Sequence, residues 1–197
     1  LKDKDNLSIS QSVNPKENDE EFKILLSDLL AALVMAVTNT EDSQLSWVLK
    51  GTRNNITEWG QEFLRSLCAD IAKEYDTRLD QNLGVDDLYD LVKIIVPYLI
   101  KNHSENDAID LLIEVEKLND MIEFVNENNY KKICLYLLAN ANYAADTEEY
   151  RAILELVYSI YFNKFHEYVN ALRVAIKIGN ILYIKQTFNQ CNDPIIK

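Results

Sequence analysis

The sequence predicts an all-α protein, an α-solenoid of antiparallel helix pairs. Glycine and proline are scarce, with 4 and 3 residues among 197, whereas leucine, isoleucine, alanine, glutamate and lysine, most of them good helix formers, are plentiful. Apolar residues recur at helical spacing along most of the chain, and short connectors favour antiparallel neighbours. The alternating pattern of a β-strand is not seen, so we expect no sheet.

Two parts are predicted. Residues 1–20 are polar and lack periodicity, which indicates a flexible polar arm. Residues 21–197 are expected to form a helical-repeat domain. Asn18 and Glu21 have the spacing of a capping box at its first helix. The apolar stripe of that helix consists of Phe22, Leu25, Leu26, Leu29, Leu30, Leu33, Val34 and Val37.

Two more helices are predicted in the first half. A short one runs from Ser43 to Lys50 and is ended by Gly51. A longer one runs from Thr57 to Arg78, and residues 79–85 connect it to the second half. Four residues of the longer helix lie on one face and are predicted to pack in the core: Trp59, Phe63, Leu67 and Ile71.

The second half is more regular. Helices are expected near residues 86–101, 105–116, 119–126, 130–141, 148–163, 167–178 and 181–190. Pro97 should kink its helix without ending it, since apolar spacing continues beyond it. Gly179 is expected to end a helix.

A shift of 63 residues aligns two helical blocks. Six pairs are identical, among them Leu91 with Leu154, His103 with His166 and Ala108 with Ala171. Any two helical hairpins could align this well by chance. If the match is real, it indicates a stacked array whose repeats bury their faces on each other.

Two groups of carboxylates suggest magnesium chemistry. Asp86, Asp87 and Asp90 have the D-D-x-x-D spacing that all-helical isoprenoid synthases use, and Asn106, Asp107, Asp110 and Glu114 follow. On helices, however, both groups face away from the apolar side, whereas a magnesium–pyrophosphate site needs carboxylates aimed into a shared cavity. Acidic residues are also favoured in the first turns of helices. We therefore predict no metal, cofactor or catalytic residue, with a magnesium-dependent helical enzyme as the alternative.

Other chemistry is not indicated by the sequence. It lacks a phosphate-binding glycine loop, a nucleophile elbow and the H-E-x-x-H and C-x-x-C motifs. Its only histidines, His103 and His166, fall at predicted helix junctions. The cysteines Cys68, Cys134 and Cys191 are expected to be buried free thiols in a reducing compartment.

Charge and hydropathy limit the partners. The net charge of −12 argues against nucleic acid and anionic membranes, which bind basic surfaces. The longest apolar run, residues 29–37, is too short to span a bilayer. We see no secretory signal at the start of the sequence.

Several strings resemble one family. They are "WGQEFLRSLCADIAKEY" (59–75), "IIVPYLIKN" (94–102), "DAIDLLIEVEKLNDMIEFVNENNYKKICLYL" (107–137) and "NALRVAIKIGNILYIKQTFNQCNDPIIK" (170–197). The family is that of the large non-ATPase scaffold subunits of the proteasome regulatory-particle base, which contain proteasome/cyclosome repeats. The resemblance covers about residues 22–197 and corresponds to the helical region that precedes the repeats.

The resemblance implies a non-catalytic scaffold of the cytoplasm and nucleus. Implied partners are the proteasome ATPase subunits and other base subunits, while ubiquitin-like shuttle proteins would bind the repeats that lie downstream. The segment is expected to be truncated at its C-terminus, so apolar residues at the junction to the repeats, Phe188, Ile195 and Ile196, should be exposed. A free-standing adaptor for basic helices is a second alternative.

Overall fold

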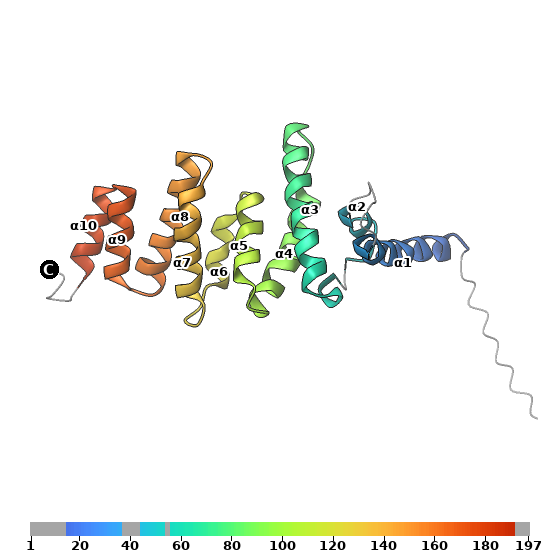
Figure 1. Ribbon diagram of the computed structural model, residues 1–197, viewed down its shortest axis with the longest axis horizontal. Helices are drawn as coiled ribbons and strands as arrows, with labels where there is room; N and C mark the ends of the chain where they lie inside the picture. The colour runs from blue at the N-terminus through green and yellow to red at the C-terminus, as the bar shows by residue number, and fades with distance from the viewer. Residues whose placement is uncertain (1–14, 37–43, 54–55, 192–197) are drawn as a thin grey trace, which may run out of the picture. The chain divides into compact units, whose positions relative to one another are not determined.

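The protein is all-α, as predicted. The computed structural model describes residues 15–36, 44–53 and 56–191; 81% of these residues are helical and none is in a β-strand (Figure 1). The chain divides into two compact units, residues 1–71 and 72–197. Residues 1–14 of the predicted arm lie outside the described residues, whereas residues 15–20 are helical.

The first unit contains α1 (Pro15–Ala36), α2 (Gln44–Val48), η1 (Ile56–Trp59) and the first half of α3 (Gln61–Asp80). The predicted cap at Asn18 is wrong, because α1 begins three residues earlier, at Pro15. Proline suits the first helical position, where its fixed φ is helical and its missing N–H would have no partner. The end of α2 is close to the prediction, and the Gly51 N–H donates to the Trp47 carbonyl at 3.0 Å.

The predicted helix over residues 57–78 is interrupted. Gly60 has a φ of +97° and separates the 3-10 turn η1 from α3, so Trp59 does not lie on the face formed by the other three predicted core residues. Phe63, Leu67 and Ile71 are at most 2% exposed. Trp59 is half-buried and meets Phe63 edge to face, with ring centroids 4.7 Å apart.

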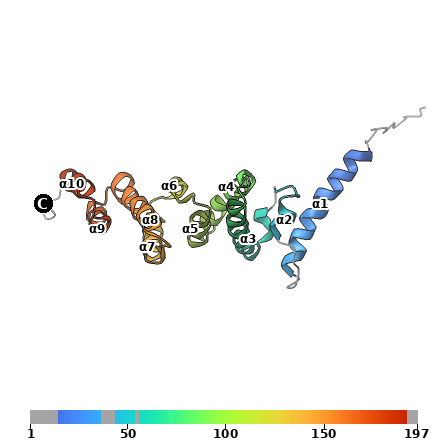
Figure 2. The ribbon, with the colours of Figure 1, turned by 90° about the horizontal axis from the view of Figure 1, so that it is seen from above.

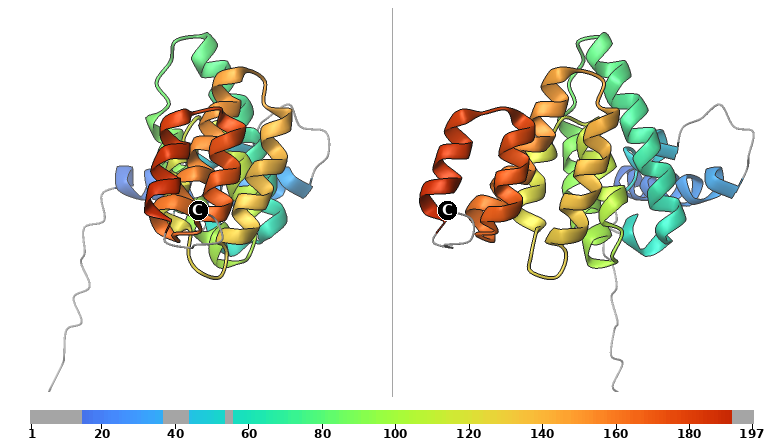
Figure 3. Two further views of the ribbon diagram at one scale, coloured as in Figure 1. Left: turned by 90° about the vertical axis from the view of Figure 1, so that its left-hand side faces the viewer. Right: turned by 60° about the vertical axis from the view of Figure 1, so that its left-hand side comes forward.

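The second unit starts with the end of α3 and continues as a row of helices. These are α4 (Asp86–Lys101), α5 (Glu105–Glu114), α6 (Met121–Phe124), α7 (Tyr130–Asn140), α8 (Thr147–Ser159), α9 (Tyr168–Ile178) and α10 (Ile181–Gln190). Contacts join α4 to α5, α5 to α7, α7 to α8, α8 to α9 and α9 to α10 (Figures 2 and 3). Each of these helices thus packs mainly against the next long helix of the row, as in a solenoid.

Small departures from the predicted elements occur at helix ends. α4 is an exception, because it continues through Pro97 to Lys101 as predicted. The predicted helix 119–126 is the 3-10 turn η2 (Leu118–Asp120) followed by α6, and α7 leads into the 3-10 turn η3 (Ala141–Tyr143). The last turn of the helix predicted over residues 148–163 is a π-helical segment, η4 (Ile160–Lys164).

The 63-residue repeat is visible in the backbone. Under this shift α4 falls on α8 and η4, α5 on α9, and η2 with α6 on α10. The identical pairs Leu91/Leu154 and Ala108/Ala171 are all at most 1% exposed. The φ angles also agree: His103 and His166 have φ of 60° and 54°, and Glu116 and Gly179 have φ of 55° and 72°. The second unit therefore contains two copies of one helical arrangement.

Left-handed residues end several of these helices. After α4, the Ser104 N–H donates to the Leu99 carbonyl at 2.9 Å, and after α5 the Lys117 N–H donates to the Leu112 carbonyl at 2.9 Å. Both are the six-to-one bonds of a Schellman turn, whose left-handed residue is here His103 or Glu116. A left-handed conformation costs a non-glycine residue about 1–2 kcal/mol.

We expect opposite effects from substitutions at the two matching positions. Gly179→Ala should destabilise the protein by about 1 kcal/mol, since a Cβ at Gly179 meets no atom within 4 Å and the cost is purely conformational. Glu116→Gly should stabilise it by about 0.5 kcal/mol, after the larger chain entropy of unfolded glycine is subtracted. Urea unfolding measures both values; changes of the same sign would contradict this account of the turns.

Candidate functional site

In the first carboxylate motif, residues 86–90, Asp87 forms an ion pair that connects two helices. In α4, the Asp87 carboxylate accepts a hydrogen bond from Arg78, which also pairs with Glu74 at 2.8 Å and donates to the Gly84 carbonyl at 3.1 Å. Partial burial acts to raise the pKa of Asp87, but the hydrogen bond and charge of Arg78 outweigh it and lower the pKa. Asp87 therefore joins the end of α3 to the start of α4.

In the second carboxylate motif, residues 106–114, Asp110 forms hydrogen bonds with side chains of α7. Both oxygens of Asp110 accept from the Tyr136 hydroxyl at 2.8 Å, and Asn140 donates to Asp110 at 3.3 Å, which ties α5 to α7. Within the residues that the structure describes, no group of three or more His, Cys, Asp or Glu side chains is placed to hold a metal ion. Asp110 and Glu114 line a surface pocket whose lining includes none of Asp86, Asp87 and Asp90, whereas a magnesium–pyrophosphate site requires the two groups in a shared cavity.

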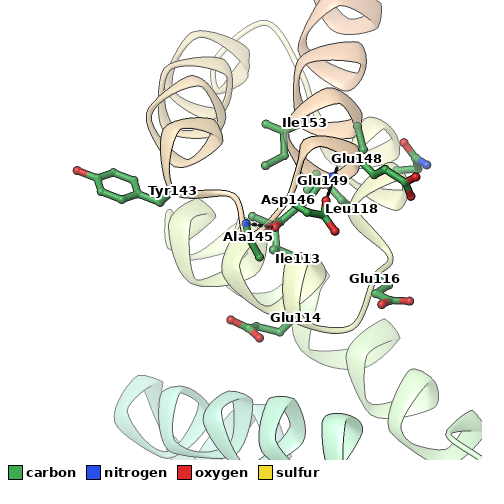
Figure 4. A pocket seen from close by; sticks show the side chains of 12 residues that line it. Ile113, Glu114, Glu116, Leu118, Tyr143, Ala145, Asp146, Glu148, Glu149 and Ile153 are labelled. Carbon is green, nitrogen blue, oxygen red and sulfur yellow. Dashed lines mark hydrogen bonds between the residues drawn. The ribbon is translucent and has the colours of Figure 1, made fainter. Parts of the chain in front are cut away.

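The second unit contains a surface groove. It has a volume of about 710 Å³ and lies between the end of α5 and the start of α8 (Figure 4). Ile113, Leu118 and Ile153 form apolar parts of its lining. The carboxylates around them are those of Glu114, Glu116, Asp146, Glu148 and Glu149.

Two of these groove carboxylates stabilise the start of α8. Asp146 accepts from the N–H groups of Glu148 and Glu149 at 2.9 and 2.8 Å, and Glu149 accepts from the Ala145 N–H at 2.6 Å. The charged form of Glu114, in contrast, is disfavoured by its surroundings. Desolvation and the neighbouring charges of Asp76, Asp110 and Glu149 raise its pKa.

A buried carboxylate lies at the start of α5. The Glu105 side chain is 4% exposed and pairs with Lys132 of α7 at 2.6 Å, and His103 Nδ1 lies 3.8 Å away. Burial acts to raise the pKa of Glu105, but the hydrogen bond from Lys132 and the Glu105 backbone N–H outweigh it, so the pKa is lowered. No sequence motif indicated this pair, because its members are 27 residues apart.

The Cys134 thiol is not activated. Cys134 is fully buried, and burial raises its pKa to about 12, although a hydrogen bond with Tyr161 partly opposes the shift. A thiol in this state is not a nucleophile at neutral pH. Cys191 is buried and Cys68 half-buried, and none of the three cysteines forms a disulfide.

The structure describes one of the three residues predicted to lie at the junction to the following repeats. Phe188 is 42% exposed on α10, whereas Ile195 and Ile196 lie outside the described residues. Other large apolar side chains of the last two helices are also exposed, namely Val169, Ile176, Ile181 and Leu182. Among the described residues, no helix combines the length and apolar character needed to cross a membrane.

Comparison with known proteins gives a consistent result. A sequence model of the family described as the RPN1 N-terminal domain matches residues 8–197. The chain is 35% identical over 190 residues to 26S proteasome non-ATPase regulatory subunit 2 homolog B of Arabidopsis thaliana. The aligned residues are 96% of this chain and 21% of that protein.

Two further relatives agree with this match. Homolog A of the same plant is 38% identical over 180 residues, which are 91% of this chain and 20% of that protein. The 26S proteasome non-ATPase regulatory subunit 2 of Dictyostelium discoideum is 38% identical over 175 residues, 89% of this chain and 19% of that protein. The chain thus spans about a fifth of the length of the curated relatives it matches.

Magnesium should not stabilise the protein. Because Asp87 is paired with Arg78 and Asp110 with Tyr136, we expect Mg²⁺, with or without pyrophosphate, to leave the Tm unchanged within about 1 °C in differential scanning fluorimetry. A ligand specific for the native state must raise the Tm. A saturable rise that disappears in Asp86→Asn would revive the enzyme hypothesis.

Removal of Lys132 should destabilise the protein in a pH-dependent way. Lys132→Ala leaves the Glu105 carboxylate buried without its cation, and we expect a loss of about 1–2 kcal/mol at pH 7, since the half-exposed lysine is partly solvated. The folded pKa of Glu105 lies below its ordinary 4.5, so the contribution is present above pH 4.5 and is lost as the pH falls through the folded pKa.

The control for this prediction is Lys93→Ala, which removes an exposed pair with Asp90 at 3.5 Å. It should cost no more than about 0.5 kcal/mol. Urea unfolding at pH 7 and at pH 3.5 measures both variants. An equal loss for both variants, or no decrease of the Lys132→Ala loss at low pH, would refute the assignment.

Proposed function

Because the chain belongs to the RPN1 N-terminal domain family, we propose that it is a non-catalytic scaffold segment of a proteasome regulatory-particle subunit. The observation that supports this most is the extent of the match, residues 8–197, nearly the whole chain. The described fold is compatible with such a role, since a row of helices presents a long surface. The groups that could have suggested catalysis, Asp87, Asp110 and Cys134, are engaged in or buried by the fold.

The proposed partners are the proteasome ATPase subunits and other subunits of the base. Ubiquitin-like shuttle proteins are proposed to bind repeats that follow this segment in the whole subunit, which the segment helps to position for ubiquitin-dependent degradation. The net charge of −12 speaks against nucleic acid as a partner. Three cysteines without a disulfide, two of them buried, are compatible with the proposed location in the cytoplasm and nucleus.

Co-sedimentation tests this function. Proteasomes from cells that produce the protein are separated on a glycerol gradient with ATP, and peptides from residues 107–137 are quantified by mass spectrometry. We expect them in the fractions of the 26S particle, in amounts close to those of the ATPase subunits. Peptides found only in light fractions would refute the proposal and favour the free-standing adaptor.

The exposed apolar residues of α9 and α10 are proposed to be the junction to the following repeats. Phe188, Ile181 and Leu182 are between 42% and 68% exposed, and we propose that the next helices cover them, together with Ile195 and Ile196. Burial of each such side chain would stabilise the contact by about 1.5–3 kcal/mol.

Hydrogen exchange tests the junction. Amides of residues 181–191 should exchange more slowly in a protein extended through the repeats than in the 197-residue chain, because α10 opens less often when its outer face is covered. Residues 86–101 of α4 serve as the internal reference and should not change. Equal, strong protection of residues 181–191 in both proteins would show that the junction proposal is wrong.

A further inference from the structure

The most apolar face of α1 points into solvent. Phe22, Leu25, Leu26, Leu29 and Leu33 are each between 41% and 64% exposed. They recur at intervals of three and four residues and form one stripe over about three turns, roughly 17 Å long. We call these five residues the α1 stripe. A contiguous apolar surface of this kind marks an interaction site.

The opposite face of α1 is the one that packs. Ser27 and Ala31 are buried, and α2 lies against α1 (Figure 2). The Asp28 carboxylate accepts from the Thr52 N–H at 3.0 Å and from its hydroxyl at 2.8 Å, which fixes the side from which α2 approaches. At about 100° per residue, Ser27 and Ala31 lie across the helix from the α1 stripe. The position of α2 therefore leaves the stripe uncovered.

Acidic residues border the α1 stripe. By the same helical geometry Asp19 and Glu21, both exposed, fall on its two sides. Glu20 is paired with Lys23 at 2.8 Å, and the last turn of α1 contains no basic residue. An antiparallel second copy of α1 would thus bring apolar residues but no positive charge to Asp19 and Glu21. A parallel copy would bring residues 15–23, whose four acidic and two basic residues carry a net negative charge.

We propose that α1 is a docking site for an amphipathic helix whose apolar stripe is flanked by lysine or arginine. Such a helix would bury the α1 stripe side by side with its own apolar face, and its cations would meet Asp19 and Glu21. This inference stands on the geometry of the first unit alone and does not require the proposed proteasome role.

Peptide binding to the 197-residue chain tests the proposal. Three labelled 21-residue helical peptides are compared by fluorescence anisotropy: one with a leucine stripe flanked by lysines, one with the same stripe flanked by glutamates, and one with lysines but serines in place of the leucines. Only the first should bind. Its Kd should rise at least tenfold in the double variant Leu25→Ser/Leu29→Ser, because two apolar contacts are lost.

Two controls make the test specific. Leu135→Ser changes an exposed leucine of α7, 66% exposed, and should leave the Kd within twofold. Asp19→Lys/Glu21→Lys should weaken binding of the lysine-flanked peptide and promote binding of the glutamate-flanked one. Circular dichroism verifies that each variant keeps its helix content, as expected for substitutions of exposed side chains.

Three outcomes would overturn the proposal. Equal binding of the serine–lysine peptide would show that charge alone attracts the ligand. Unchanged binding in Leu25→Ser/Leu29→Ser would place the peptide elsewhere on the chain. Self-association of the chain in analytical ultracentrifugation, abolished by the same double variant, would show that the occupant is a second copy.

Discussion

In the second unit, a helix can cover its apolar face only with the helices that adjoin it in the row. Ile133, Cys134 and Leu137 of α7 are fully buried although α7 is only 11 residues long, because α5 and α8 both pack against it. The direction in which each helix leaves the previous one is therefore decisive. Left-handed residues such as His103, Glu116 and Gly179 set that direction, and their recurrence after 63 residues explains why two stretches with few identities adopt one arrangement.

Several carboxylates help to hold neighbouring helices of the second unit together. Asp87, Glu105, Asp146 and Glu167 all lie at or beside the first residue of a helix, where the helix dipole favours negative charge. Three of them also bind a side chain of another helix: Asp87 binds Arg78, Glu105 binds Lys132, and Glu167 accepts from Tyr130. Asp87, which belongs to a motif that would suggest catalysis, thus joins α3 to α4, while Glu105 and Glu167 join α5 and α9 to α7.

The sequence predicted most of the fold because helical periodicity and local stop signals act over short distances. The bounds of α4 and α10 agree with the prediction. Two departures involve local signals that were not recognised: α1 begins at Pro15 and not after Asn18, and Gly60 separates Trp59 from α3. The side on which α2 lies against α1 is set by packing and could not be predicted from the helical pattern. The groove between α5 and α8 could not be predicted either, since its two acidic segments are about 30 residues apart in the sequence and meet only through packing.

Within α10, Thr187 is the one buried residue, and its hydroxyl lies 3.1 Å from that of Tyr158 in α8. Because α10 also packs against α9, it is attached to two helices of the row. A force applied to α10 would therefore be transmitted to α8 directly as well as through α9, so that the three helices would resist it together.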